Sequence, residues 1–155
     1  MKVILIAIGD NEDAYLAKGF EVYEKRLSHY LSFEVQLIPT LKNKTKTKET
    51  IMEAEAKEIM KKLAPTDLLI LLDAEGKEYS STEFAGQMQK FLNMPGKRLV
   101  FLIGGAYGFA PEVYQRAQQK ISLSKMTFNH QMARLFFLEQ LYRAMTILKG
   151  EKYHH

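Results

Sequence analysis

A glycine loop between a buried strand and a helix is the segment of this sequence best suited to hold a cofactor. Residues 99–103 are apolar and run into Gly104, Gly105 and Gly108, after which Pro111 begins a helical pattern. Glycine permits positive φ and lets a ligand approach bare backbone amides. The spacing does not match a dinucleotide fingerprint, because the loop follows the fourth strand and no acidic residue stands on a following strand about 20 residues later. A tight turn that requires glycine is the alternative interpretation.

Two further loops follow strands in the same way. One spans residues 73–77 and carries Asp73 and Glu75, which could orient the hydroxyl or amine groups of a ligand. Paired carboxylates at a strand end are also common in solvated turns, and that reading remains open. The other spans residues 123–130 and is small and polar. Because the carboxyl ends of parallel strands meet at one edge of a sheet, the three loops are predicted to converge on one cofactor pocket.

The positive charge of the chain is concentrated near its end. Residues 116–155 carry seven Lys or Arg against two acidic residues and three of the four histidines, whereas the whole chain has a formal net charge of +4. This asymmetry indicates a polyanionic partner such as nucleic acid, with a solvated basic helix as the alternative. The lysine-rich segment Lys42–Lys48 is a second candidate RNA contact or a solvated loop.

Composition excludes several classes of protein. The chain has no cysteine, which rules out disulfides, thiolate catalysis and cysteine-ligated metals and is compatible with a reducing cytoplasm. His154 and His155 lack convergent carboxylates, so no metal site is expected. No apolar run approaches the roughly 20 residues that span a bilayer, and acidic residues directly after the short opening run argue against a signal sequence. We expect a cytoplasmic protein without a membrane partner.

Apolar runs of strand length alternate with stretches of helical period, which predicts a single α/β domain over residues 1–155 with a parallel sheet. Ser81 and Asn129 are the predicted N-caps of the helices that follow them, and Gly150 suits the end of the last helix. Strands are predicted at Val3–Ile8, Phe33–Ile38, Leu68–Leu72, Leu99–Ile103 and around Ile121–Leu123, and helices at Ala14–Leu27, Lys48–Leu63, Thr82–Leu92, Pro111–Gln119 and Gln131–Leu148.

The last predicted helix is apolar nearly all round, so it must be covered on more than one side. A second copy of the chain is one cover, since two-fold pairing is the commonest form of oligomer. Burial within the monomer is the other. A homodimer through this helix would bring the end of one chain, from Lys152 onward, toward the cofactor loops of its partner.

The sequence also resembles a known family. The segments that carry the resemblance recur in order over essentially the full length, and they are Tyr23–Leu27, Gly76-Lys77, Ile103–Gly105, Ser122–Thr127, Tyr142–Ala144 and Gly150–His154. In them the chain resembles the small bacterial RlmH-type methyltransferases of the SPOUT superfamily. The resemblance implies a parallel α/β sheet flanked by helices with a deep C-terminal trefoil knot, which periodicity alone does not predict. It also implies a homodimer that uses S-adenosylmethionine to methylate N3 of a pseudouridine in helix 69 of 23S ribosomal RNA, in assembled ribosomes.

Site residues follow from the resemblance, position by position. The implied methyl-donor residues are Leu72, Gly104, Leu123, Ser124, Lys125, Met126, Thr127 and Phe128. The residues implied to face the RNA or the reacting base are Arg134, Tyr142, Arg143, Tyr153 and His154, and Lys149 and Lys152 add positive charge beside them.

The implied chemistry needs no metal, because the leaving thioether of a sulfonium is already activated. The imide N3 is protonated near neutral pH, so a base must remove its proton. His154 or Tyr153 is the candidate base or base-orienting group, and Arg143 is the candidate stabiliser of the anion. Two rival functions remain at this stage. They are a nucleotide-binding α/β protein that uses the glycine loop for phosphates, and a non-catalytic RNA-binding or ribosome-binding module.

Overall fold

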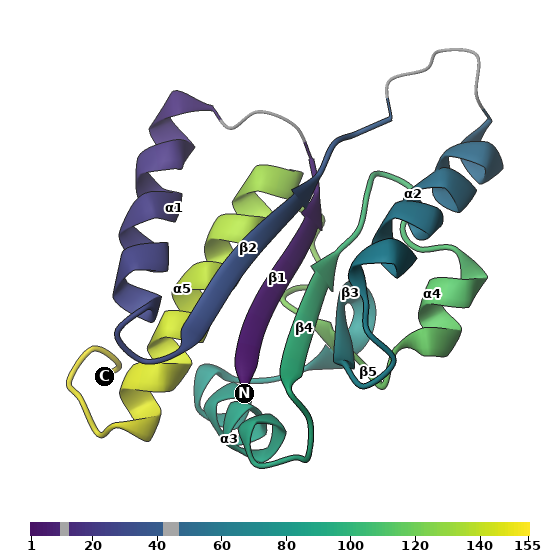
Figure 1. The fold of residues 1–155 in the computed structure, drawn as a ribbon. Coiled ribbons are helices and arrows are strands. Elements are labelled where there is room, and N and C mark those ends of the chain that lie inside the picture. Colours follow the sequence, from purple (N-terminus) through teal and green to yellow (C-terminus); the bar gives the residue numbers. More distant parts are fainter. Residues whose placement is uncertain (10–12, 42–46) are drawn as a thin grey trace.

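The computed structural model describes residues 1–9, 13–41 and 47–155 (Figure 1). Most of the predicted loop Lys42–Lys48 therefore lies outside the described residues. The strands are β1 (Lys2–Ile8), β2 (Ser32–Ile38), β3 (Leu68–Glu78), β4 (Arg98–Ile103) and β5 (Gln119–Ser122). The helices are α1 (Ala14–Leu27), α2 (Lys48–Lys62), α3 (Ser81–Leu92), α4 (Pro111–Arg116) and α5 (His130–Leu148).

The strands form one sheet in the order β2-β1-β4-β3-β5, and every neighbouring pair is parallel. Parallel sheets need cover on both faces, and their strands read as continuous apolar runs. Val3–Ile8 in β1 and Leu99–Ile103 in β4 are almost fully buried, as this rule requires. The predicted parallel α/β sheet flanked by helices is confirmed.

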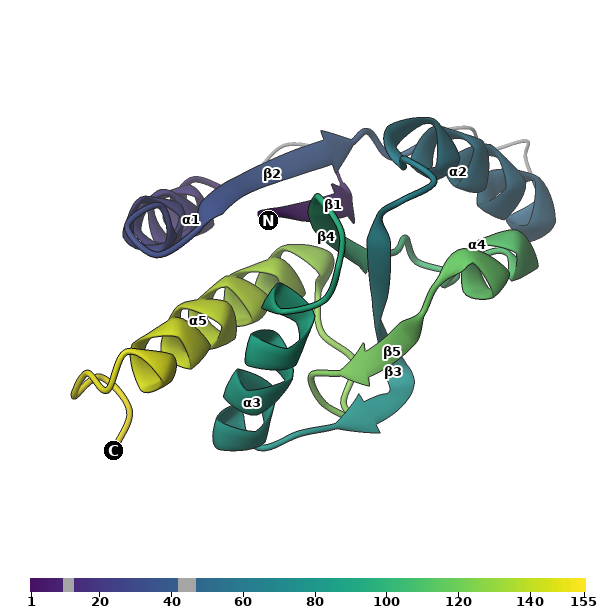
Figure 2. The ribbon, with the colours of Figure 1, turned by 60° about the horizontal axis from the view of Figure 1, so that its bottom comes forward.

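Helices cover both faces of the sheet in three layers (Figures 1 and 2). On one face α1, α3 and α5 enclose an apolar cluster that contains Phe20, Phe101 and Phe137. The rings of Phe101 and Phe137 lie 4.8 Å apart, which ties α5 directly to β4. On the other face α2 and α4 pack on a second cluster through residues such as Ile59 and Val113. Burial of α5 against α1 and α3 leaves only part of its surface for another chain.

Some boundaries differ from the predictions. The prediction that a helix extends to Gln119 is wrong, because α4 ends at Arg116 and Gln119 begins β5, where backbone pairing with β3 outweighs helical propensity. The predicted N-cap Ser81 is also wrong. Ser80 holds that position, accepting from Glu83 N while the Glu83 carboxylate accepts from Ser80 N. Asn129 is confirmed as the cap of α5 through its bond from Gln131 N.

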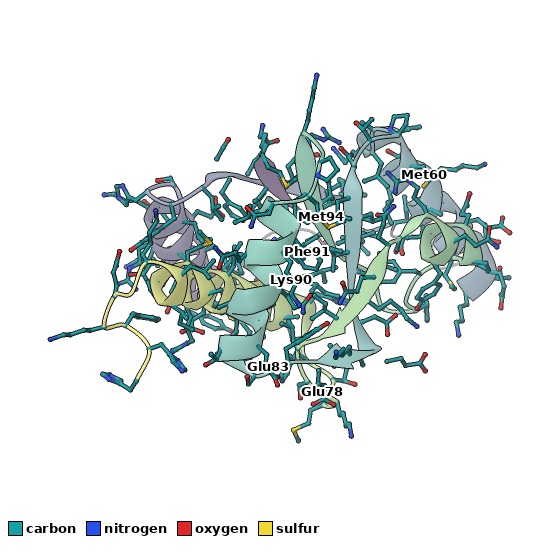
Figure 3. All side chains as sticks on the ribbon, turned by 90° about the horizontal axis from the view of Figure 1, so that it is seen from below. Met60, Glu78, Glu83, Lys90, Phe91 and Met94 are labelled. Atoms are coloured by element: carbon teal, nitrogen blue, oxygen red, sulfur yellow. The ribbon has the colours of Figure 1, made fainter. Side chains whose placement is uncertain are left out.

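The third strand does not end at Leu72, as predicted, but continues to Glu78 after a wide irregularity. Leu72 and Lys77 both pair with Ile121, so residues 73–76 leave the ladder between them. A Cβ on Gly76 would lie 2.7 Å from backbone atoms of Ile121, so only glycine fits at this close approach. Figure 3 marks Glu78 at the edge where the chain turns from β3 toward Glu83 in α3.

An ion-pair network fastens the amino end of β3. Arg98 donates to both carboxylate oxygens of Asp67, a side chain that is only 1% exposed. Arg116 donates to the carbonyls of Ala64 and Asp67. Burial acts to raise the pKa of Asp67, but the bonds from Arg98 and from Ala64 N outweigh it and hold that pKa below its ordinary value. The network anchors the sheet at the end opposite the candidate site.

Candidate methyl-donor cavity and C-terminal cluster

A cavity of about 380 Å³ lies at the carboxyl ends of β3, β4 and β5. The three loops singled out in the sequence all contribute to its wall. Seven of the eight predicted cofactor residues line it, namely Leu72, Gly104, Leu123, Ser124, Met126, Thr127 and Phe128. The eighth, Lys125, does not. Its side chain is 86% exposed, and its Nζ lies 3.8 Å from Glu78 Oε1.

The irregularity in β3 places Asp73 at the wall of this cavity in a fixed orientation. Asp73 Oδ1 accepts from Glu75 N at 2.8 Å, and its Oδ2 accepts from the Tyr114 hydroxyl at 2.6 Å. Burial, together with the bond to Asp73, raises the pKa of Tyr114 to about 12, so the phenol stays protonated and keeps donating. Tyr114 was missed by sequence reasoning because nothing in the pattern of α4 linked it to the residue 41 positions earlier.

Packing as well as ligand access explains the glycines of the loop after β4. A Cβ on Gly104 would lie 2.8 Å from the ring of Phe109, and one on Gly105 would lie 2.5 Å from the Glu55 carboxylate. Gly108 has φ +79°, which disfavours any other residue. Phe109 itself lines the cavity. A larger residue at position 104 would therefore displace a wall of the cavity as well as fill it.

The loop after β5 is held by its own serines. Ser122 Oγ donates to the carbonyl of Ser124, and Ser124 Oγ accepts from Met126 N, both at 3.0 Å. These bonds turn the backbone toward the cavity, and the side chain of Met126 remains 76% exposed. Asn129 then starts α5, whose first turn adds Ala133 to the cavity wall. Ala133 was not predicted, since a small residue in an apolar helix carries no signal of a site.

A second group of predicted residues meets around Glu139 in α5. Glu139 Oε1 accepts from Arg143 Nη2 at 2.6 Å, from Arg143 Nε at 3.1 Å and from the Tyr153 hydroxyl at 3.0 Å. Arg143 Nη1 lies 3.1 Å from His154 Nδ1. Since Arg143 can only donate, Nδ1 accepts, and the neutral His154 ring carries its proton on Nε2. We call Glu139, Arg143, Tyr153 and His154 the C-terminal cluster.

Electrostatics distinguish the members of the C-terminal cluster. Burial raises the pKa of Tyr153, and its hydrogen bonds with Tyr23 and Glu139 raise it further above the ordinary range. Hydrogen bonding to the Glu139 carboxylate raises the pKa of Arg143 above its ordinary value, although burial acts to lower it. Tyr153 is therefore a neutral donor at physiological pH and a poor base. Arg143 is a permanent cation that already contacts His154.

The candidate RNA residues occupy different environments. Lys149 and Lys152 are exposed at the end of α5 and in the tail. Tyr142 is half-buried, with its ring 4.7 Å from the ring of Tyr153 and the Arg26 guanidinium 5.4 Å from its centroid. Arg134 is only 4% exposed, and its guanidinium lies 3.9 Å from the ring centroid of Phe20. In this conformation Arg134 faces the protein interior rather than solvent.

The two groups of site residues lie toward opposite ends of α5. Ala133 lines the cavity and Arg143 belongs to the C-terminal cluster, and ten residues of helix separate them by roughly 15 Å along the axis. Figure 1 shows α5 running from the edge where the strands end to the opposite edge, where the tail lies beside the end of α1. The Tyr30 hydroxyl donates to Glu151 at 2.6 Å and holds the tail there.

Among the described residues, no group of three or more His, Asp or Glu side chains is arranged to hold a metal ion. The described helices also include none that is long and apolar enough to cross a membrane.

Comparison with known proteins identifies the family. A family model described as "Predicted SPOUT methyltransferase" matches residues 1–154, so the chain belongs to the SPOUT methyltransferases. The chain is 55% identical to a ribosomal RNA large subunit methyltransferase H of Cytophaga hutchinsonii over 155 residues, with 100% of both chains covered. Proteins of the same name in Porphyromonas gingivalis and Flavobacterium psychrophilum are 49% and 51% identical over 156 residues, which cover 100% of this chain and 99% of theirs. The resemblance found in the sequence is confirmed.

Proposed function

We propose that this chain transfers a methyl group from S-adenosylmethionine to N3 of a pseudouridine in helix 69 of 23S ribosomal RNA, acting in the cytoplasm on the assembled ribosome. The observation that carries the proposal is the cavity of about 380 Å³ formed by the loops after three adjacent strands. Membership of a methyltransferase family and full-length similarity to proteins named for ribosomal RNA support it. The same membership supports a C-terminal trefoil knot.

The lining of the cavity fits the proposed methyl donor. Its volume falls within the range of about 300–1,000 Å³ that is usual for small-molecule sites. Leu72, Ile103 and Phe109 offer apolar surface to an adenine ring, and the fixed carboxylate of Asp73 can accept from ribose hydroxyls or an amine. The loop from Leu123 to Phe128 contributes backbone groups, which is how Lys125 takes part although its side chain points away. When bound, the donor supplies a methyl group on a sulfonium that needs no further activation.

The C-terminal cluster has the groups that the acceptor base requires. We assign Arg143 to stabilise the anion that forms when N3 loses its proton, and His154 to take that proton. The two are already hydrogen-bonded at 3.1 Å. When the Arg143 N–H turns to an oxygen of the base, it frees His154 Nδ1 to accept the proton. Tyr153, a neutral donor bound to Glu139, orients the cluster.

We propose further that the active site is shared between two chains. The roughly 15 Å between the cavity and the cluster along α5 is too long for one methyl transfer. Phe136, on the outward side of α5, is 41% exposed and leaves apolar surface on this helix for a second chain. In such a homodimer Tyr153 and His154 of one chain complete the cavity of the other.

Complementation tests the shared site. Ala133→Phe fills the cavity from α5 and His154→Ala removes the base, and each homodimer should be inactive. Heterodimers of the two variants should regain one working site. Verified heterodimers that transfer no methyl group would contradict the shared site.

RNA binding is assigned to the exposed Lys149 and Lys152 and to Tyr142 beside them. Arg134 joins this surface only if it leaves its place over Phe20. Incubation with tritiated S-adenosylmethionine and ribosomes tests the proposed activity. Label in 23S RNA supports it, whereas ribosome binding without label points to a non-catalytic binding module. Affinity for NAD or FMN in place of S-adenosylhomocysteine points to a nucleotide-binding protein.

A further inference from the structure

A second cavity adjoins the proposed methyl-donor cavity. Its volume is about 360 Å³, and it lies between the end of β5, the start of α3 and the middle of α5. Leu72, Leu123 and Phe128 line both cavities, so the two cavities share part of their walls. None of the predicted catalytic or RNA-binding residues lines this second cavity.

The walls of the second cavity are rich in aromatic rings. Tyr79, Phe84, Phe128, Phe136 and Phe137 all contribute. The rings of Phe128 and Phe136 lie 5.0 Å apart. Enzymes that modify a base draw it out of its stack and hold it between aromatic or apolar side chains. The ring-lined walls offer a planar base that kind of environment beside the methyl donor.

Two polar side chains converge inside this cavity with fixed orientations. Ser81 Oγ donates to Gln140 Oε1 at 2.7 Å, and Gln140 Nε2 donates to Glu139 Oε2 at 3.0 Å. The carboxylate accepts only, so it fixes the amide with its nitrogen toward Glu139 and its oxygen toward Ser81. One N–H of Nε2 and one lone pair of Oε1 remain for a ligand. An adjacent donor and acceptor of this kind bind a complementary pair on the edge of a base.

We propose that this second cavity receives the target base and that Gln140, oriented by Ser81 and Glu139, recognises it as a pseudouridine. In pseudouridine the ribose is attached to C5, so N1 keeps a hydrogen next to the C2 carbonyl. Gln140 Oε1 accepts from N1–H, and Nε2 donates to O2. N3 lies on the other side of O2 and stays open to the methyl donor. Uridine carries its ribose on N1 and offers no donor there.

The hydrogen-bond chain also joins recognition to the C-terminal cluster. Glu139 accepts from Gln140 through Oε2 and from Arg143 and Tyr153 through Oε1. A shift of the Gln140 amide on binding the base therefore reaches the carboxylate that holds Arg143 of the same chain, whose cluster serves the partner's cavity in the proposed homodimer. Gln140 is a specificity residue for the reaction, and Ser81 is its positioning residue.

The test compares ribosomes that carry pseudouridine at the target with ribosomes that carry uridine there, and it rests on the proposed function. Gln140→Leu keeps the size of the side chain and removes both bonds to the base. We expect about a tenfold fall in kcat/KM on pseudouridine ribosomes and little change on uridine ribosomes, with unchanged affinity for S-adenosylhomocysteine. Ser81→Ala should cause a smaller fall in the same direction. Gln115→Leu on the exposed surface of α4 is the matched control.

A Gln140→Leu enzyme that keeps the wild-type preference for pseudouridine overturns this inference and leaves the proposed function standing. Equal losses on both ribosomes also overturn it, because they indicate a structural role. Wild-type protein that methylates neither ribosome overturns the proposed function and the inference together. If Gln140→Leu fails to fold, the test is made with Ser81→Ala. Its kcat/KM should fall more on pseudouridine ribosomes than on uridine ribosomes, and equal values or equal losses overturn the inference.

Discussion

Replacing Glu139 by glutamine should impair methyl transfer without weakening cofactor binding. The Glu139 carboxylate holds Arg143 through two bonds and Tyr153 through a third, and its side chain is 20% exposed. Glutamine keeps the shape but loses the charge and presents an N–H to one of these donors. Hydrogen bonds to a partly buried charge are worth about 1.5–3 kcal/mol each. Loss of one such bond corresponds to roughly a 10- to 100-fold fall in kcat/KM.

The assay pairs initial rates of label transfer to ribosomes with calorimetry of S-adenosylhomocysteine binding. The cavity that we assign to the cofactor is lined by other residues, so its affinity should stay within about twofold of wild type in the Glu139→Gln variant. Glu151→Gln is the matched control. It also removes a carboxylate that accepts from a tyrosine near the tail, but Glu151 is exposed, and such pairs contribute about 0–1 kcal/mol.

Two results would refute this reasoning. A parallel loss of cofactor affinity and rate would mean that the C-terminal cluster and the cavity are not separate parts of the site. An unchanged rate in the Glu139→Gln variant would mean that the arrangement of Arg143 and Tyr153 does not matter to the chemistry.

Three further outcomes are expected. Ala133→Phe should weaken S-adenosylhomocysteine binding more than tenfold by calorimetry, because the ring enters the cavity, whereas Ala133→Ser should leave it unchanged. Lys152→Ala should reduce the slope of log affinity for ribosomes against log salt by about 0.7, because one phosphate contact is lost. Lys57→Ala, on the far face of the sheet, should leave that slope unchanged. A Lys152→Ala variant with the wild-type slope would contradict a phosphate contact at Lys152. Asp67 has a folded pKa below its ordinary 3.8, so its stabilising effect is complete above that pH and is lost as the pH falls through the folded pKa. Asp67→Asn should therefore lower the free energy of unfolding by about 3 kcal/mol at pH 7 in urea titrations. The difference in free energy of unfolding between the variant and wild type should shrink in acid. A difference that does not change with pH would contradict a lowered pKa for Asp67.

Much of the fold could be predicted from hydrophobic pattern. Apolar runs such as Leu99–Ile103 allow little but a buried strand, and the alternation with helices favours parallel pairing. Sheet order and the irregularity in β3 could not be predicted, because they depend on which strands meet in space. Gly76 carried the one local signal of the irregularity, since an isolated glycine in a strand marks a bulge or a close backbone approach.

The sequence indicated the loops of the candidate site but not its internal contacts. Glycines and small polar residues marked the segments that line the methyl-donor cavity, whereas Tyr114 and Ala133 gave no such mark. Gln140 was also passed over, because a glutamine in an apolar helix has meaning only once Ser81 and Glu139 are beside it. The burial of Arg134 likewise depends on its packing over Phe20 from a distant helix.

The most direct test of the proposed function is to locate the methyl group. Ribosomes from a strain that lacks the endogenous activity are incubated with this protein and S-adenosylmethionine, and the 23S RNA is mapped by mass spectrometry. We expect one new methyl group, on N3 of a pseudouridine in helix 69. A methyl group on another nucleotide, or none at all, would contradict it.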